Sequence, residues 1–312
     1  MVDLDTSQSR LIIFIILLII IIPSIVCSIY IFYHFIRFHE LRQSVNNHII
    51  LVLLIISFIQ VVGELPLTLI FLRTGSVAIL SDKFCQFWTV LNYSVCTGSL
   101  WTMAIASIER YWLVFHRTFF NKYIIILHYI PIILCIIYPL ILYTYLVAIY
   151  TCTNTFDYSY WTCGGACYLY EPLLGTLDWV INGCTNVLLS TLVTWIIIIR
   201  VLIQKQRVNS QRTVWQRSRR IIMQLIVLSA LYMIVWLPCV ICFVITLFTP
   251  VPFLTALYGA YLSYYQYIAC LLCPFACLLG SSEIRQVMRN RRVVQPSTLI
   301  MQPITQRIQH QT

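Results

Sequence analysis

Residues 11–36 read LIIFIILLIIIIPSIVCSIYIFYHFI, a stretch without a single Asp, Glu, Lys or Arg. A helix needs about 20 mostly apolar residues to cross a lipid bilayer, and this stretch is long enough. It is too long for the apolar part of a signal peptide, and it carries no small-residue cleavage site. We therefore interpret it as a retained membrane helix.

Six further apolar stretches follow along the chain. The seven cover residues 11–36, 48–71, 84–115, 123–150, 173–203, 221–248 and 253–280, with approximate ends. None alternates polar and apolar side chains as a strand of a membrane barrel does. The stretches are therefore predicted to be helices, in which the backbone N–H and C=O groups are hydrogen-bonded within lipid. The sequence predicts an all-α membrane protein with a seven-helix bundle over residues 1–280. Residues 281–312 are predicted to form a short amphipathic helix on the cytoplasmic membrane surface, followed by a tail.

The composition excludes several other classes of protein. Hydrophobic residues make up 60% of the chain and charged residues 10%, with a mean hydropathy of +0.87. A soluble domain has about half apolar and about a quarter charged residues. A soluble enzyme, a disordered chain and a nucleic-acid-binding domain are therefore excluded. The net charge of +10 comes from basic blocks between apolar stretches, which indicates membrane topology rather than a nucleic-acid partner.

The basic residues also predict the orientation. With the N-terminus outside, seventeen of the 20 Lys and Arg residues fall on the cytoplasmic side, and only Arg10, Arg73 and Lys83 remain outside. Cytoplasmic loops of membrane proteins are enriched in Lys and Arg, so the sequence predicts an extracellular N-terminus.

Several motifs lie at the ends of these stretches. Glu109-Arg110-Tyr111 ends the third stretch, where an arginine alone would be typical of a side chain reaching the membrane surface. Cys85 precedes Arg110 by 25 residues, at the other end of the same stretch. The sixth stretch contains Trp236-Leu237-Pro238, whose proline would kink a helix, and the seventh contains Pro274.

With these motifs, essentially the whole chain resembles a rhodopsin-like G-protein-coupled receptor. The resemblance implies that Arg110 connects the inner ends of the third and sixth helices at rest, with Glu109 as its ion-pair partner. On activation Arg110 would release Glu109 and form part of the G-protein cavity. Trp236 would change rotamer at the base of the ligand pocket, while Pro238 and Pro274 would act as hinges.

The sequence also departs from the usual pattern of this family. The seventh stretch reads Cys273-Pro274-Phe275-Ala276-Cys277, without the usual Asn and Tyr on either side of the proline motif. Ser57 stands where the second helix of relatives carries a sodium-binding Asp. The chain is therefore identified as a divergent member.

Four cysteines are predicted to lie outside: Cys85, Cys152, Cys163 and Cys167. Four cysteines allow three pairings. The resemblance implies a bridge from Cys85 to the second outer loop, to either Cys163 or Cys167. A second bridge involving Cys152 would then form in the oxidising extracellular compartment. The alternative is one bridge with two free thiols.

The ligand pocket is predicted from positions in the outer halves of the helices. The candidate residues are Glu64, Asn92, Cys96, Asp178, Asn182, Cys239, Phe243 and Tyr264. Amine receptors of the family have an Asp at the position of Asn92, so a monoamine ligand is disfavoured. The tyrosines of the seventh stretch, Tyr264 among them, would equally suit an aromatic belt at the membrane surface.

Glu64 is a carboxylate at membrane depth, which by default indicates a functional site. One interpretation makes it the counter-ion of a basic group on the ligand, with Asp178 as the second candidate. The alternative is a structural salt bridge to Arg73.

The predicted function is that of a plasma-membrane receptor in the lipid bilayer. It would bind an extracellular ligand, a small peptide or a small organic molecule, and activate a heterotrimeric G protein. We predict no enzymatic activity, no catalytic residues, no cofactor and no metal site. The main alternative is a seven-span ligand-gated channel or transporter, which would need a polar path through the bilayer. A decoy receptor is a third alternative, disfavoured by the Glu109-Arg110-Tyr111 motif.

Overall fold

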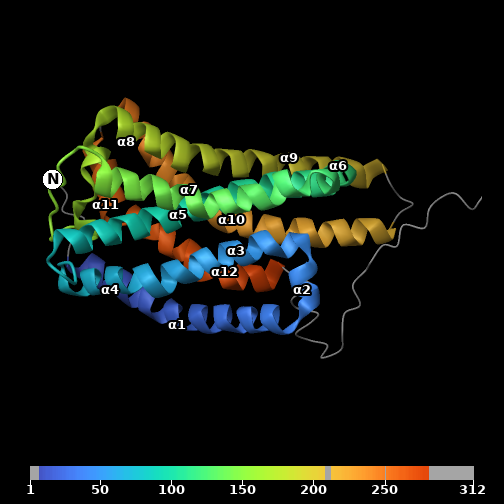
Figure 1. The fold of residues 1–312 in the computed structure, drawn as a ribbon, viewed down its shortest axis with the longest axis horizontal. Coiled ribbons are helices and arrows are strands. Elements are labelled where there is room, and N and C mark those ends of the chain that lie inside the picture. The colour runs from blue at the N-terminus through green and yellow to red at the C-terminus, as the bar shows by residue number, and fades with distance from the viewer. Residues whose placement is uncertain (1–6, 208–211, 250, 281–312) are drawn as a thin grey trace, which may run out of the picture.

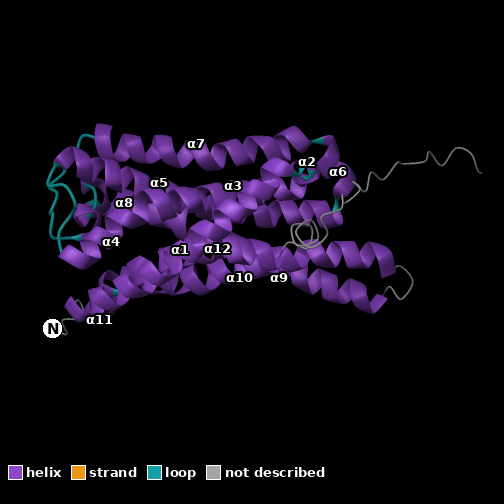
Figure 2. Cartoon of the chain, turned by 90° about the horizontal axis from the view of Figure 1, so that it is seen from below, coloured by secondary structure: helices purple, strands orange, loops and turns teal. Residues whose placement is uncertain are grey.

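The computed structural model describes residues 7–207, 212–249 and 251–280. Over these residues Figure 2 shows helices joined by loops. The predicted all-helical class is therefore confirmed for the part of the chain described. The predicted surface helix and tail, residues 281–312, lie outside the described residues.

The long helices run along one common axis (Figure 1). The first two are α1 (Ser7–Arg37) and the continuous stretch of α3 (Val45–Ile59), η1 (Gln60–Glu64) and α4 (Leu65–Thr74). The next two are α5 (Asp82–Phe115) and the stretch of η2 (Ile125–Tyr129), α7 (Ile130–Thr144) and η3 (Tyr145–Ile149). They are followed by α8 (Pro172–Asp178) with η6 (Trp179–Cys184) and α9 (Thr185–Arg207), and by α10 (Arg212–Phe248). The last stretch contains α11 (Pro252–Ala260), η7 (Leu262–Tyr264) and α12 (Tyr265–Gly280).

Short elements close the two ends of the bundle. The segment 151–171, here called the lid, contains the 3-10 turns η4 (Trp161–Gly164) and η5 (Cys167–Tyr170). It covers the end of the bundle at which α4, α8 and α11 lie, here called the lid end. The short helices α2 (His39–Gln43) and α6 (Arg117–Lys122) lie at the opposite end (Figure 1).

Six helical stretches of the described chain are long and apolar enough to cross a membrane. They are Ser7–Arg37, Asn47–Thr74, Ile125–Ile149, Pro172–Ile203, Ile226–Phe248 and Pro252–Gly280. Helix α5 is 34 residues long but more polar, and it contacts α3, α7, α9 and α10. A helix that packs against protein on several sides needs fewer apolar side chains than one that faces lipid. Its buried polar side chains, such as Thr89, Asn92 and Ser107, fit this central place.

Wide π-helical turns interrupt three of the long stretches: η1, η2 with η3, and η6. The turn η1 comes directly before Pro66, which lacks the N–H that a regular helix would use. Such a turn changes the direction of the side chains that follow, and Glu64 at its end is fully buried. The sequence predicted the helix here but not this turn.

Candidate functional site

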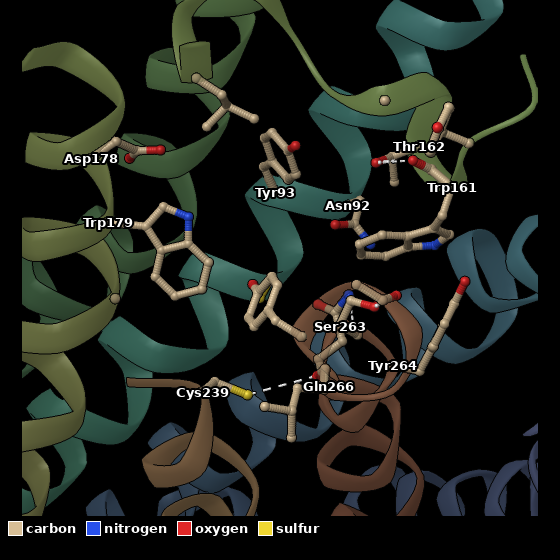
Figure 3. Close-up of a pocket in the computed structure, with 18 of the residues that line it drawn as sticks. Asn92, Tyr93, Trp161, Thr162, Asp178, Trp179, Cys239, Ser263, Tyr264 and Gln266 are labelled. Atoms are coloured by element: carbon tan, nitrogen blue, oxygen red, sulfur yellow. Dashed lines mark hydrogen bonds between the residues drawn. The ribbon is translucent and has the colours of Figure 1, made fainter. Parts of the chain in front are cut away.

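A cavity of about 820 Å³ lies at the lid end of the bundle. Its walls come from the lid, α5, α8 with η6, α10 and the stretch of η7 and α12 (Figure 3). The side chain of Trp236 lines it, and Trp236 is only 7% exposed. The volume suits a small molecule or a short stretch of peptide.

Two disulfide bonds fix the lid. Cys85 at the start of α5 is bonded to Cys163, and Cys152 is bonded to Cys167. Between the lid cysteines the backbone takes positive φ at Thr162 and Cys163, and again at Gly164 and Gly165. Residues with a side chain rarely adopt this conformation, whereas glycine does so at little cost. The bridge to α5 and the glycines together turn the lid sharply over the cavity.

Hydrogen bonds attach the lid to the helices beneath it. Trp161 donates from Nε1 to Oγ1 of Thr68 in α4 at 3.1 Å, and Thr89 of α5 donates to the Thr162 carbonyl at 3.3 Å. At the rim, the Tyr158 hydroxyl donates to Asp82 at 2.7 Å. This bond to a carboxylate raises the pKa of the Tyr158 phenol.

Most of the predicted pocket residues line the cavity. They are Asn92, Cys96, Asp178, Asn182, Cys239 and Tyr264. Phe243 does not line it but stacks on Trp179 with ring centroids 5.2 Å apart, and so supports the wall from behind. Glu64 does not line it either, because η1 turns this side chain into the bundle interior.

The sequence did not single out three aromatic lining residues: Tyr93, Trp179 and Tyr258. Trp179 begins η6, and it lines the cavity together with Asp178 and Asn182. Residues i, i+1 and i+4 lie on one broad face of a helix, so the helical periodicity that paired Asp178 with Asn182 could also have indicated Trp179.

Glu64 is the centre of a buried polar network. Its Oε1 accepts hydrogen bonds from Trp88 Nε1 at 2.8 Å, the Tyr267 hydroxyl at 2.8 Å and Thr68 at 3.0 Å. Asn92 donates to the Tyr267 oxygen at 3.4 Å. The network joins α4, α5 and α12 just beneath the lid. The predicted alternative, a salt bridge from Glu64 to Arg73, does not form in the described structure, where Arg73 is exposed.

Asp178 carries a second polar cluster, on the other side of the cavity. Tyr143 and Asn182 donate to its Oδ1 at 3.0 and 2.7 Å, and Tyr168 of the lid donates to its Oδ2 at 3.1 Å. The side-chain oxygen of Asn182 accepts from Trp101 at 3.1 Å. These contacts connect the carboxylate to the lid, α5 and α7.

A third cluster lies at the end of the bundle opposite the lid. Oε2 of Glu109 lies 2.9 Å from Nδ1 of His128 in η2. Nε2 of His128 lies 3.1 Å from Nδ1 of His48, and Nε2 of His48 lies 2.6 Å from the Arg42 carbonyl. The acid of the Glu109-Arg110-Tyr111 motif is therefore bound by a histidine that the sequence analysis did not assign to the site.

The other residues of the predicted switch lie either beside Glu109 in α5 or inside α10 and α12. Arg110 is buried, with 2% exposure, and Tyr111 lies under the guanidinium of Arg200 at 5.3 Å. Pro238 lies inside α10 and Pro274 inside α12. Among the described residues no group of three or more His, Cys, Asp or Glu side chains could hold a metal ion.

A helical membrane bundle with a cavity beneath a disulfide-bonded lid is typical of a membrane receptor. Residues 28–276 match the family described as 7 transmembrane receptor (rhodopsin family). This match covers most of the chain, so the chain belongs to that family, and the predicted resemblance is confirmed. Members of this family are receptors rather than enzymes. No curated protein matches the sequence significantly.

Proposed function

We propose that the chain crosses the plasma membrane seven times, with the N-terminus outside and with α5, the third helix in chain order, as a span in addition to the six apolar stretches. Residues 1–280 form the receptor domain, and the lid end faces the extracellular side. The distribution of Lys and Arg supports this orientation. The cysteine-rich lid supports it too, because disulfides form in oxidising compartments.

An extracellular ligand, a small peptide or a small organic molecule, binds in the cavity beneath the lid, and the occupied receptor activates a heterotrimeric G protein. The observation that carries this proposal is the course of α5. This one helix carries Cys85, which is bonded to the lid, and Asn92 at the cavity, and it carries Glu109 and Arg110 at the opposite end. A ligand shifts the equilibrium between two conformations of the bundle only if it binds one of them more tightly. Because α5 extends from the cavity to the opposite end, it can connect ligand binding with a change at that end.

The remaining members of the switch support the same mechanism. Trp236 forms part of the cavity wall two residues before Pro238, the residue that would allow α10 to bend. Pro274 is buried inside α12, which packs on α10. A ligand that displaces Trp236 would bend α10 at Pro238 and so move the end of α10 that lies opposite the lid.

The test is a cell-based screen with a promiscuous G-protein α subunit and separate libraries of short peptides and small organic molecules. We expect a response that is lost in Arg110→Ala and retained in Arg117→Ala, an exposed arginine at the same end, at equal surface expression. An antibody against a tag at residue 1 should bind intact cells. A ligand-evoked ion current that persists with G proteins disabled would favour the channel or transporter instead.

A further inference from the structure

Among the described residues, three charged side chains line the cavity: Arg10, Asp157 and Asp178. Asp157 is exposed, and its carboxylate accepts the backbone N–H of Ser159 within the lid. Arg10 lies against Gly75, in the loop between α4 and α5. Asp178, in the wall formed by α8 and η6, is the carboxylate attached to both the lid and the bundle (Figure 3).

The hydrogen bonds of Asp178 orient its carboxylate without neutralising it. All three donors, Tyr143, Tyr168 and Asn182, are uncharged groups. No Lys, Arg or His among the described residues forms an ion pair with Asp178. A carboxylate oxygen accepts two hydrogen bonds, so Oδ2, with one donor, keeps an acceptor position. A charge removed from water is unfavourable unless a partner of opposite charge joins it.

Aromatic rings line the cavity beside this carboxylate. Figure 3 shows Trp179 next to Asp178 on the same wall, with Tyr93 facing them. Trp179 is fixed by its stacking on Phe243 and by an edge contact with Tyr258, at 5.9 Å between ring centroids. Aromatic faces attract cations, most strongly where water is excluded. A carboxylate among such rings forms a site for a cationic nitrogen group.

We propose that the cavity takes a ligand with an ammonium or guanidinium group, and that this group pairs with Asp178. This inference rests on the proposed function, because it specifies the ligand of the same cavity. It assigns the counter-ion to Asp178 rather than to Glu64. Glu64 is fully buried outside the cavity lining, and its Oε1 is already engaged by three donors. Asn92 disfavours an amine paired at its own position, but Asp178 supplies a carboxylate elsewhere in the same cavity. The cation therefore belongs either to a small organic amine or to a Lys or Arg side chain of a peptide.

The test uses a native thiol and needs no known ligand. Cys96 is a free cysteine that lines the cavity, and so does Cys239. The purified full-length chain carrying Cys239→Ala is treated with a cationic methanethiosulfonate, the ethylammonium reagent, and with the anionic ethylsulfonate reagent. Mass spectrometry assigns the modification to Cys96, and Cys96→Ala removes it. The measured quantity is the ratio of the cationic to the anionic reaction rate.

We expect this ratio to fall by about tenfold or more in Asp178→Asn, because a nearby charge acts in opposite directions on the two reagents. Asp178→Glu, which keeps the charge, should retain the preference, and it guards against misfolding of the Asn variant. Asp82→Asn, at an acid that does not line the cavity, is the matched control and should leave the ratio unchanged. An unchanged ratio in Asp178→Asn, or an equal fall in Asp82→Asn, would overturn the proposal.

Protection experiments distinguish the two sources of the cation. The rate of Cys96 modification is measured in the presence of 2-phenylethylammonium and, separately, of an acetylated, amidated Phe-Arg dipeptide. Each of these cations is compared with its uncharged analogue. Protection by one of the cations identifies the source, and equal protection by the uncharged analogues would overturn the proposal. Because modification of Cys96 involves no G protein, a Cys239→Ala chain that reacts equally with both reagents but still signals refutes this inference alone. An intact ratio without any G-protein response refutes the proposed function alone.

Discussion

Nδ1 of His128 lies 2.9 Å from Oε2 of Glu109, and both side chains are completely buried. The contact joins η2 to α5 at the end of the bundle that carries the Glu109-Arg110-Tyr111 motif. Through His48 it extends to α3 and to the Arg42 carbonyl in α2. The family resemblance alone implied only Arg110 as the partner of Glu109. In this structure an imidazole from a neighbouring stretch also binds this acid.

The first prediction concerns this contact. His128→Phe should lower the thermal unfolding temperature of the purified protein, because it removes a buried hydrogen-bond partner of Glu109, and an unsatisfied buried polar group costs about 1–3 kcal/mol. Adding Glu109→Gln should recover part of that loss, since the two residues interact directly. Equal unfolding temperatures for His128→Phe and the unmodified chain would contradict the contact. Strictly additive losses in the double variant would contradict it as well.

The second prediction concerns the two disulfides. Cys85–Cys163 closes a loop with a sequence separation of 78, and Cys152–Cys167 one of 15. In the chain-entropy model these bonds contribute about 4 and about 3 kcal/mol. Cys85→Ser should therefore lower stability and surface delivery more than Cys152→Ser, because it also frees the lid from α5. Thermal unfolding and cell-surface labelling measure the two effects. Normal surface level and stability in Cys85→Ser would refute the structural role of this bridge.

The third prediction concerns Glu64. Glu64→Leu removes the acceptor of three buried donors, and each unsatisfied donor costs about 1–3 kcal/mol. We expect a large drop in the unfolding temperature, and tryptophan fluorescence during heating measures it. Glu64→Gln keeps an acceptor oxygen and should be much less harmful, while Arg73→Gln should have no effect. Equal losses from Glu64→Gln and Arg73→Gln would instead support a salt bridge between these residues.

The fourth prediction concerns access to the cavity. Trp161 donates to Thr68, and its ring lies 5.6 Å from that of Tyr264, so it fastens the lid across the mouth. Trp161→Ala should speed the reaction of Cys96 with a small thiol reagent about tenfold or more, as local opening becomes easier. Thr153→Ala is the control, because Thr153 lies in the same lid but is exposed and does not line the cavity. Similar rates in Trp161→Ala and the unmodified chain would show that Trp161 does not close the mouth.

The sequence by itself determined the helices and their approximate ends. Long apolar stretches can only be membrane helices in lipid, and this property is local to each stretch. Motifs within single stretches, those of Cys85, Glu109 and Trp236, also indicated the receptor family, which the match over residues 28–276 shows.

Only the tertiary structure decided which side chains face one another. Glu64 and Asp178 are both carboxylates in the outer halves of predicted helices, yet Glu64 is buried outside the cavity lining, whereas Asp178 and Trp179 both line the cavity. Cys163 rather than Cys167 is bonded to Cys85, because the left-handed backbone of the lid brings it there. His128 reaches Glu109 from a stretch 19 residues away. Contacts between helices depend on packing among distant segments, and no local pattern of residues encodes them.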